Sequence, residues 1–195
     1  GMDRTSINLR STAKLAKWLS ADVKVNYVNQ HTDNRIKLAG DPDNIFLNYL
    51  NTPRSIAFSD YDAYKDNNWK RADGKPAGFL IDPGANANNP YWSAYRNTNH
   101  DKKDRLIGFA ALDFTFTDWL NLKLRSGMDN YTIEYENIRA TGNPYWENNG
   151  SMTANMEKFT EVNSDFLLTA KGNWDRFGIV GTLGGNVMYR SRNWY

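Results

Sequence analysis

Residues 101–131 alternate apolar and polar side chains along two runs that a very short turn separates. On the first run, Gly108 interrupts an apolar series made of Leu106, Ala110, Leu112, Phe114 and Phe116. After a turn at residues 117–119, the second run places Leu120, Leu122 and Leu124 between Asn121, Lys123 and Arg125. A repeat of two is the period of a β-strand, because successive side chains point to opposite faces of a sheet. Each run extends over about a dozen residues, whereas globular strands usually have about five or six. The pattern therefore predicts two long strands of a length that suits a membrane-crossing hairpin, which needs roughly 9–11 residues per strand.

The same hairpin pattern occurs twice more. We predict hairpins near residues 3–29, 103–135 and 163–190, and each has a tryptophan at its short turn: Trp18, Trp119 and Trp174. Two interpretations of these indoles remain open. They pack a turn onto a soluble sheet, or they form an aromatic girdle at a membrane–water interface, where an amphipathic ring is favoured.

Long polar connections lie between the predicted hairpins, at residues 30–100 and 136–162. Within the first, Asp43 or Asn44 is a suitable N-cap for a short helix that starts at Ile45 and ends before Pro53. Short turns at one end and long loops at the other are typical of outer-membrane barrels. A soluble sandwich shows turn signals about every 8–12 residues instead. We predict an all-β chain whose antiparallel β-hairpins form a single partial transmembrane-type β-barrel over residues 1–195, with about six strands and long loops.

Composition excludes several other classes. The mean hydropathy is −0.73 and no apolar run approaches the length of a membrane-spanning helix. A membrane barrel stays possible, because its polar inner face lowers every apolar count. The net charge is +2 and basic residues are interleaved with acids, so we expect no nucleic-acid partner. The absence of cysteine excludes disulfides and thiolate metal sites.

The sequence offers few residues for catalysis or metal binding. His31 and His100 are the two histidines. Both lie in the predicted loop at 30–100, far apart in sequence and without a ligand partner at useful spacing, so we expect surface loop residues. The segment from Asp41 to Asn44 lacks the glycine and distal glutamate of an EF-hand and is better interpreted as a turn. No hydrolase, nucleotide-binding or metalloprotease motif is present. We expect no enzyme, no cofactor and no metal.

The tetrapeptide Asn-Pro-Tyr-Trp occurs twice in the predicted loops, at residues 89–92 and 143–146. Proline restricts the backbone, and the two rings present flat apolar faces with polar tips. Two interpretations remain open: the rings pin the loops onto the rim of the sheet, or they stack on sugar rings or anchor a peptide. We predict that these aromatic residues lie near a ligand or partner surface: Tyr91, Trp92, Tyr145 and Trp146.

Several of these segments resemble the barrel region of the SusC/RagA family, the TonB-dependent outer-membrane transporters of Bacteroidetes. The resemblance covers nearly the whole chain and rests on residues 20–27, 52–56, 89–92, 104–108, 118–120 and 125–129. It implies a closed barrel of about 22 strands with a plugged lumen. It also implies import of glycans, peptides or other large nutrients, with TonB and a SusD-like surface lipoprotein as partners. No plug, TonB box or signal peptide is recognisable here, so we expect a piece of a longer outer-membrane protein.

The alternative is a soluble β-sheet module that binds glycans or peptides through its loop aromatics. The two interpretations differ in the place of the apolar strand face. A barrel wall turns this face toward lipid, whereas a soluble module buries it in a core.

Overall fold

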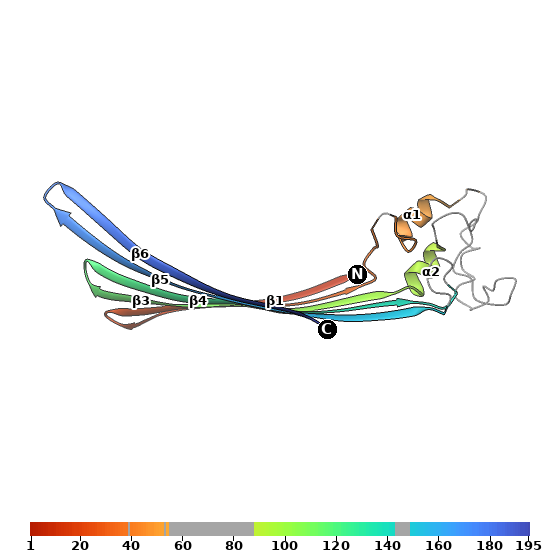
Figure 1. The fold of residues 1–195 in the computed structure, drawn as a ribbon, viewed down its shortest axis with the longest axis horizontal. Helices are drawn as coiled ribbons and strands as arrows, with labels where there is room; N and C mark the ends of the chain where they lie inside the picture. Colours follow the sequence, from red (N-terminus) through yellow and green to blue (C-terminus); the bar gives the residue numbers. More distant parts are fainter. Residues whose placement is uncertain (39, 53, 55–87, 143–148) are drawn as a thin grey trace. The chain divides into compact units, whose positions relative to one another are not determined.

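Six long strands and two short helices make up the regular structure of the described residues. The computed structural model describes residues 1–195 apart from residues 39, 53, 55–87 and 143–148. In chain order the elements are β1 (Met2–Ala16), β2 (Leu19–Asp33), α1 (Ile45–Leu50), α2 (Pro90–Tyr95), β3 (Asn99–Thr117), β4 (Leu120–Arg139), β5 (Ser151–Trp174) and β6 (Phe177–Trp194). The strands form one sheet in the order of the chain, from β1 to β6 (Figure 1). The prediction of an all-β chain of antiparallel hairpins is confirmed.

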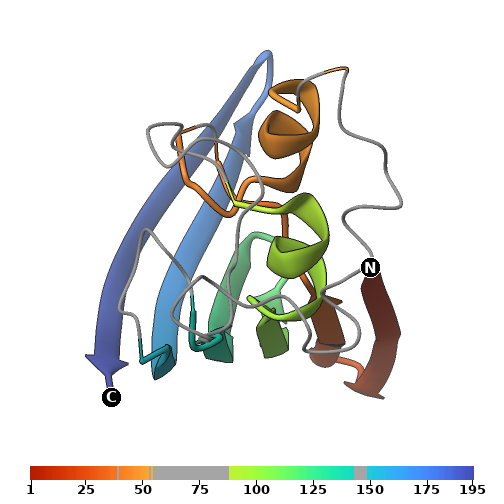
Figure 2. The ribbon, with the colours of Figure 1, turned by 90° about the vertical axis from the view of Figure 1, so that its right-hand side faces the viewer.

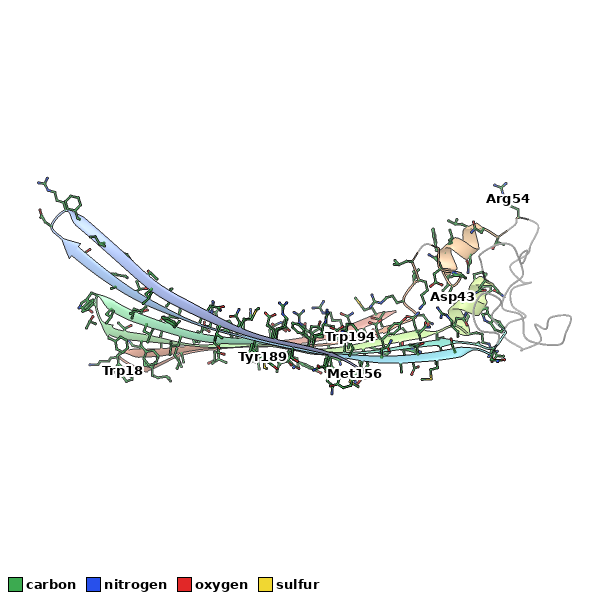
Figure 3. All side chains as sticks on the ribbon, in the orientation of Figure 1. Trp18, Asp43, Arg54, Met156, Tyr189 and Trp194 are labelled. Carbon is green, nitrogen blue, oxygen red and sulfur yellow. The ribbon has the colours of Figure 1, made fainter. Side chains whose placement is uncertain are left out.

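Two-residue turns close the three hairpins, at residues 17–18, 118–119 and 175–176. Trp18 lies at the closed end of the β1–β2 hairpin (Figure 3). Its carbonyl oxygen accepts a hydrogen bond of 2.9 Å from the amide of Thr115, and the Trp119 carbonyl oxygen accepts one of 2.8 Å from the amide of Lys171. In the third turn Asp175 has a φ of 46°, in the left-handed region that aspartate adopts more readily than most residues. Each turn thus connects its strands within the shortest length a hairpin allows.

The strands are longer than the sequence pattern predicts. β2 continues to Asp33, β3 begins at Asn99, and β5 begins at Ser151, which shortens both predicted loops. The residues added to β2 and β3 are polar on both faces, so no apolar alternation marks them. The start of β5 does alternate, with Met152, Ala154 and Met156 on one face, and the predicted loop at 136–162 missed this short signal. By contrast, α1 lies where the capping signal predicts it. The Asn44 side chain is its N-cap and accepts a hydrogen bond of 2.9 Å from the amide of Leu47.

The described residues divide into two compact units, each described here by itself. The helix unit comprises Gly1–Asp3, His31–Lys102 and Glu134–Asn155, and the strand unit comprises Arg4–Gln30, Lys103–Ile133 and Met156–Tyr195. Within the helix unit, α1 and α2 pack side by side (Figure 2). Neither helix, nor any other in the described part of the chain, has the length and apolarity to cross a membrane.

Apolar side chains predominate on one face of the strand unit, and the cross-strand ion pairs lie on the other. Residues two apart on a strand share a face. The apolar face therefore takes odd-numbered residues of β1, β2 and β6 and even-numbered residues of β3, β4 and β5. Its exposed members include Ile7, Leu9, Val23, Val25, Leu112, Phe116, Leu124, Phe166, Ile179, Leu183 and Val187. The register of β5 and β6 places Leu168 opposite Leu183 on this face.

The opposite face of the strand unit is cross-linked by ion pairs. Five pairs join neighbouring strands, at 2.5–2.9 Å: Arg10–Asp22, Arg105–Asp129, Arg125–Asp165, Arg190–Glu161 and Arg192–Glu157. Buried hydrophobic side chains are few in the described residues, namely Val28, Trp92 and Ala111. The sheet is thus amphipathic, with an apolar face that nothing in the described strand unit covers.

Gly108 interrupts the apolar series of β3 because the neighbouring backbone is too close for a side chain. A Cβ atom built there would lie 2.7 Å from the carbonyl oxygen of Lys24 on β2. A Cβ atom built on Gly181 of β6 would have no neighbouring atom within 4 Å. Backbone atoms move less readily than the end of a flexible side chain, so a methyl group at residue 108 would strain the β2–β3 pairing.

We expect Gly108→Ala to destabilise the sheet by about 1–3 kcal/mol, the usual cost of overpacking. Gly181→Ala is the control and should be neutral or slightly stabilising, since alanine restricts the unfolded chain more than glycine does. The measurement is the denaturant midpoint of both variants by far-UV circular dichroism. Equal midpoints for the two variants would show that β2 and β3 separate locally at no cost, and would contradict the close packing at Gly108.

Candidate functional site

A buried carboxylate organises the helix unit. Asp43 is 4% exposed, and its Oδ1 accepts hydrogen bonds from Asn88 Nδ2 at 2.6 Å, Ser93 Oγ at 3.2 Å and Asn97 Nδ2 at 2.7 Å. Its Oδ2 lies 3.6 Å from Nε of Arg139. Ser93 belongs to α2, beside which Asp43 lies (Figure 3). One carboxylate, from the segment before α1, thus contacts α2, the residues just before and after α2, and the last residue of β4.

Asparagine side chains fix both helices to this centre. Asn44 caps α1 and also donates its Nδ2 to the carbonyl oxygen of Lys37 at 2.9 Å. Asn89 caps α2, accepting from the amide of Tyr91 at 2.9 Å, and Pro90 occupies the first turn. Proline is favoured there because its missing amide hydrogen has no partner in a helix start. The fully buried Asn48 donates to the carbonyl oxygen of Pro42 at 2.7 Å. Polar side chains therefore supply the specific contacts of this unit.

The two helices border an aromatic cavity of about 190 Å³, lined by Ile45, Tyr49, Pro90, Tyr91, Ala94 and Tyr95. Tyr49 and Tyr95 are exposed and Tyr91 is half-buried, so the cavity opens to solvent with tyrosines at its mouth. Tyr91, a predicted site residue, lies here. The predicted Trp92 is 3% exposed and packs inside the unit. Tyr145 and Trp146 lie outside the described residues. The assignment of all four to a ligand or partner surface stays a prediction.

The two histidines lie next to each other, in contrast to their distance in sequence. His31 is on β2 and His100 on β3, so the expectation that both are loop residues without a partner was wrong. Their rings stack with centroids 6.3 Å apart and planes 7° apart. His31 Nε2 lies 2.8 Å, and His100 Nδ1 2.6 Å, from the same Asp33 Oδ1. Sequence reasoning could have paired His31 with Asp33, since residues two apart share a strand face, but His100 joins them through strand register.

The two histidines also lower the pKa of the Asp33 carboxyl. The hydrogen bond with His100 lowers the pKa of the Asp33 carboxyl below its ordinary value, against an opposing effect of desolvation. Electrostatic interaction with the two imidazoles lowers this pKa further. Both effects favour the ionised carboxylate.

The polar face of the strand unit is hollowed and mixed in charge. A cavity of about 460 Å³ is lined by residues of β1 to β4, among them Asp22, Asp113, Lys123 and Arg125. Elsewhere on this face, the Tyr131 hydroxyl donates to Glu157 Oε1 at 2.9 Å. The Tyr131 ring stacks on the Phe159 ring at 4.8 Å. Such a surface is hydrated and suits polar solutes rather than lipid.

Comparison with known proteins supports this fold. The RagAB peptide importer in its closed-closed state matches with a TM-score of 0.61 and 15% identity, covering 98% of this chain and 21% of that chain. Its open-open state matches with a TM-score of 0.56 and 16% identity, covering 98% and 21%. The RagAB peptide transporter matches with a TM-score of 0.58 and 17% identity, covering 98% and 22%.

The chain therefore spans about a fifth of the length of the chains it matches, and at this identity the likeness concerns the fold. No protein-family model matches the sequence, and no curated protein matches it.

We expect Asp43→Ala to loosen the helix unit, because it leaves buried amide and hydroxyl donors without their acceptor. An unsatisfied buried donor costs about 1–3 kcal/mol, which corresponds to a roughly 5–150-fold larger population of the locally opened state. The measurement is hydrogen–deuterium exchange of the α1 and α2 amides in the full chain. Asp3→Ala removes an exposed carboxylate of the same unit and serves as control. Unchanged exchange in Asp43→Ala would remove Asp43 from the centre of the unit.

Proposed function

We propose that this chain is a segment of the wall of an outer-membrane transporter of the SusC/RagA type. The observation that carries the proposal is the strand unit, with one apolar face and one ion-paired face. A transmembrane barrel needs this division, since lipid covers one face and water the other. Long antiparallel strands also satisfy each other's backbone groups, as lipid requires.

The five cross-strand ion pairs support an inward position for the polar face. Charged side chains on the lipid side of a barrel cost about 2–4 kcal/mol at the bilayer midplane. The ion pairs of the strand unit share one face, and the exposed aliphatic residues dominate the other. The same division in a soluble protein would require a second layer to cover the apolar face.

The turn tryptophans support a periplasmic girdle. Trp18 and Trp119 are 52% and 54% exposed, although indoles usually bury more of their surface. The Trp18 ring stacks on Phe114, and Phe114 stacks on Phe116, both at 6.1 Å. Aromatic side chains gathered at strand ends are what a membrane–water interface favours.

The helix unit belongs to the side that receives the cargo. The matched structures carry the name peptide importer, and peptides share with glycans the mixed polar and apolar groups that a tyrosine-lined cavity accommodates. We propose peptides, glycans or other large nutrients as cargo. Tyr91, Trp92, Tyr145 and Trp146 would lie near the cargo or a SusD-like surface lipoprotein. TonB would be the second partner of the complete protein in the outer membrane, and no catalysis is part of the proposal.

The decisive experiment is the location and size of the protein in its source cells. An antibody against residues 103–135 would be used to blot outer-membrane and soluble fractions. The proposal expects an outer-membrane band several times the 22.4 kDa of this chain. A soluble band near that mass would overturn it in favour of a soluble glycan- or peptide-binding module.

Neighbouring residues of β6 test the orientation of the wall. Leu183 lies on the apolar face and is 64% exposed, and Thr182 lies on the polar face and is exposed as well. Leu183→Arg should destabilise the folded barrel by about 2–4 kcal/mol for a residue at the bilayer midplane. Less folded protein should therefore be recovered from the outer membrane. Thr182→Arg, at nearly the same depth, should be tolerated. The measurement is the folded fraction in purified outer membranes, and equal recovery of both variants would contradict a lipid-facing Leu183.

A further inference from the structure

Three potential metal ligands converge where β2 and β3 meet in the helix unit. His31 Nε2, Asp33 Oδ1 and His100 Nδ1 all lie within 4.8 Å of one another. The side chains of His31, Asp33 and His100 are 45%, 45% and 41% exposed, so an ion from solvent reaches them. We propose that these three residues bind a divalent late transition metal, with Zn²⁺ as the best-suited ion. This proposal does not depend on the transporter function.

The donor set matches the chemistry of Zn²⁺. Zn²⁺ sites commonly combine two imidazole nitrogens with one carboxylate oxygen, and water takes the fourth position. The metal–ligand distances in such sites are about 2.0–2.2 Å. Carboxylate oxygens alone would favour Mg²⁺ or Ca²⁺, whereas imidazole selects zinc, copper and nickel.

The ligand atoms need to move only a short distance to coordinate an ion. The two ring nitrogens now lie close to Asp33 Oδ1, at 2.8 Å for His31 and 2.6 Å for His100. A tetrahedral ion holds its ligand atoms roughly 3.3 Å apart, given metal–ligand distances of about 2.0–2.1 Å. To admit the ion, the ring nitrogens therefore move away from Asp33 Oδ1 by about 0.5 Å for His31 and about 0.7 Å for His100, a change that side-chain torsions supply. The nearly parallel rings, 7° apart, already face the same carboxylate.

The strands hold the ligands from both sides. His31 and Asp33 are two apart on β2 and share a face, and His100 projects from the paired strand β3. Next to them, the amide of Asn34 donates to the carbonyl oxygen of Asn99 at 2.7 Å. The Asn34 side chain donates to the carbonyl oxygen of Ala94 at 3.0 Å. A site built on paired strands is more precise than one on loops, and the bound ion would clamp the ends of β2 and β3 together.

Composition makes the site simple to test. The whole sequence contains two histidines and no cysteine, so no other imidazole pair or thiolate competes for the ion. The experiment titrates the folded full chain with Zn²⁺ against a chromophoric chelator, after far-UV circular dichroism has verified the β-structure. The variants are His31→Gln, His100→Gln and Asp33→Asn. Asp3→Asn, which removes an exposed carboxylate elsewhere, is the control.

We expect one Zn²⁺ per wild-type chain. Loss of a residue that only hydrogen-bonds to a metal ligand weakens binding by roughly 10–100-fold. Each histidine variant loses a ligand itself and should weaken Zn²⁺ binding by more than this. The control should bind as the wild type does. The same titration in denaturant separates a folded site from free histidines, because the unfolded chain lacks the strand register. The proposal is overturned by no binding to the folded chain, by equal binding in denaturant, or by binding that both histidine variants retain.

Discussion

The fold depends on what covers the apolar face of the sheet. A single sheet layer gains little from burial within itself, and the described residues bury three hydrophobic side chains, Val28, Trp92 and Ala111. Hydrophobic burial is the dominant favourable contribution to folding in water, at about 25 cal/mol per Å². The strand unit leaves most of that contribution to its surroundings. Lipid on one side and water on the other would supply it, and this requirement connects the composition, the ion pairs and the proposed location.

The helix unit is held by the opposite kind of interaction. Its centre is the carboxylate of Asp43, and its two helices are each capped by an asparagine side chain. Buried polar networks are costly when incomplete and specific when satisfied. Such a network fixes one arrangement of α1 and α2 without a large apolar core. It also sets the tyrosines Tyr49, Tyr91 and Tyr95 around their cavity, so the rigid part of the unit positions its aromatic surface.

The sequence predicted the parts of the fold that local physics determines. Alternation revealed the strands where one face is apolar, as along Leu120 to Leu124, and the cap at Asn44 located α1. It did not reveal the polar start of β3 at Asn99, since a strand segment that is polar on both faces has no period to detect. The pairing of His31 with His100 was missed for a related reason. It depends on the register of β2 against β3, which no local pattern encodes.

Polar side chains also fix the register of neighbouring strands. A two-residue turn fixes the register within each hairpin, but long segments connect β2 to β3 and β4 to β5. A slip of one residue would move every side chain to the wrong face. Asp104 on β3 accepts from Tyr27 and Asn29 on β2, and Arg35, just after β2, binds Asp101 on β3 through two nitrogens. Between β4 and β5, Arg125 binds Asp165 and Asn130 binds Thr160. Directional contacts thus fix the register of the strand pairs that lack tight turns, and the histidine cluster lies on one of these pairs.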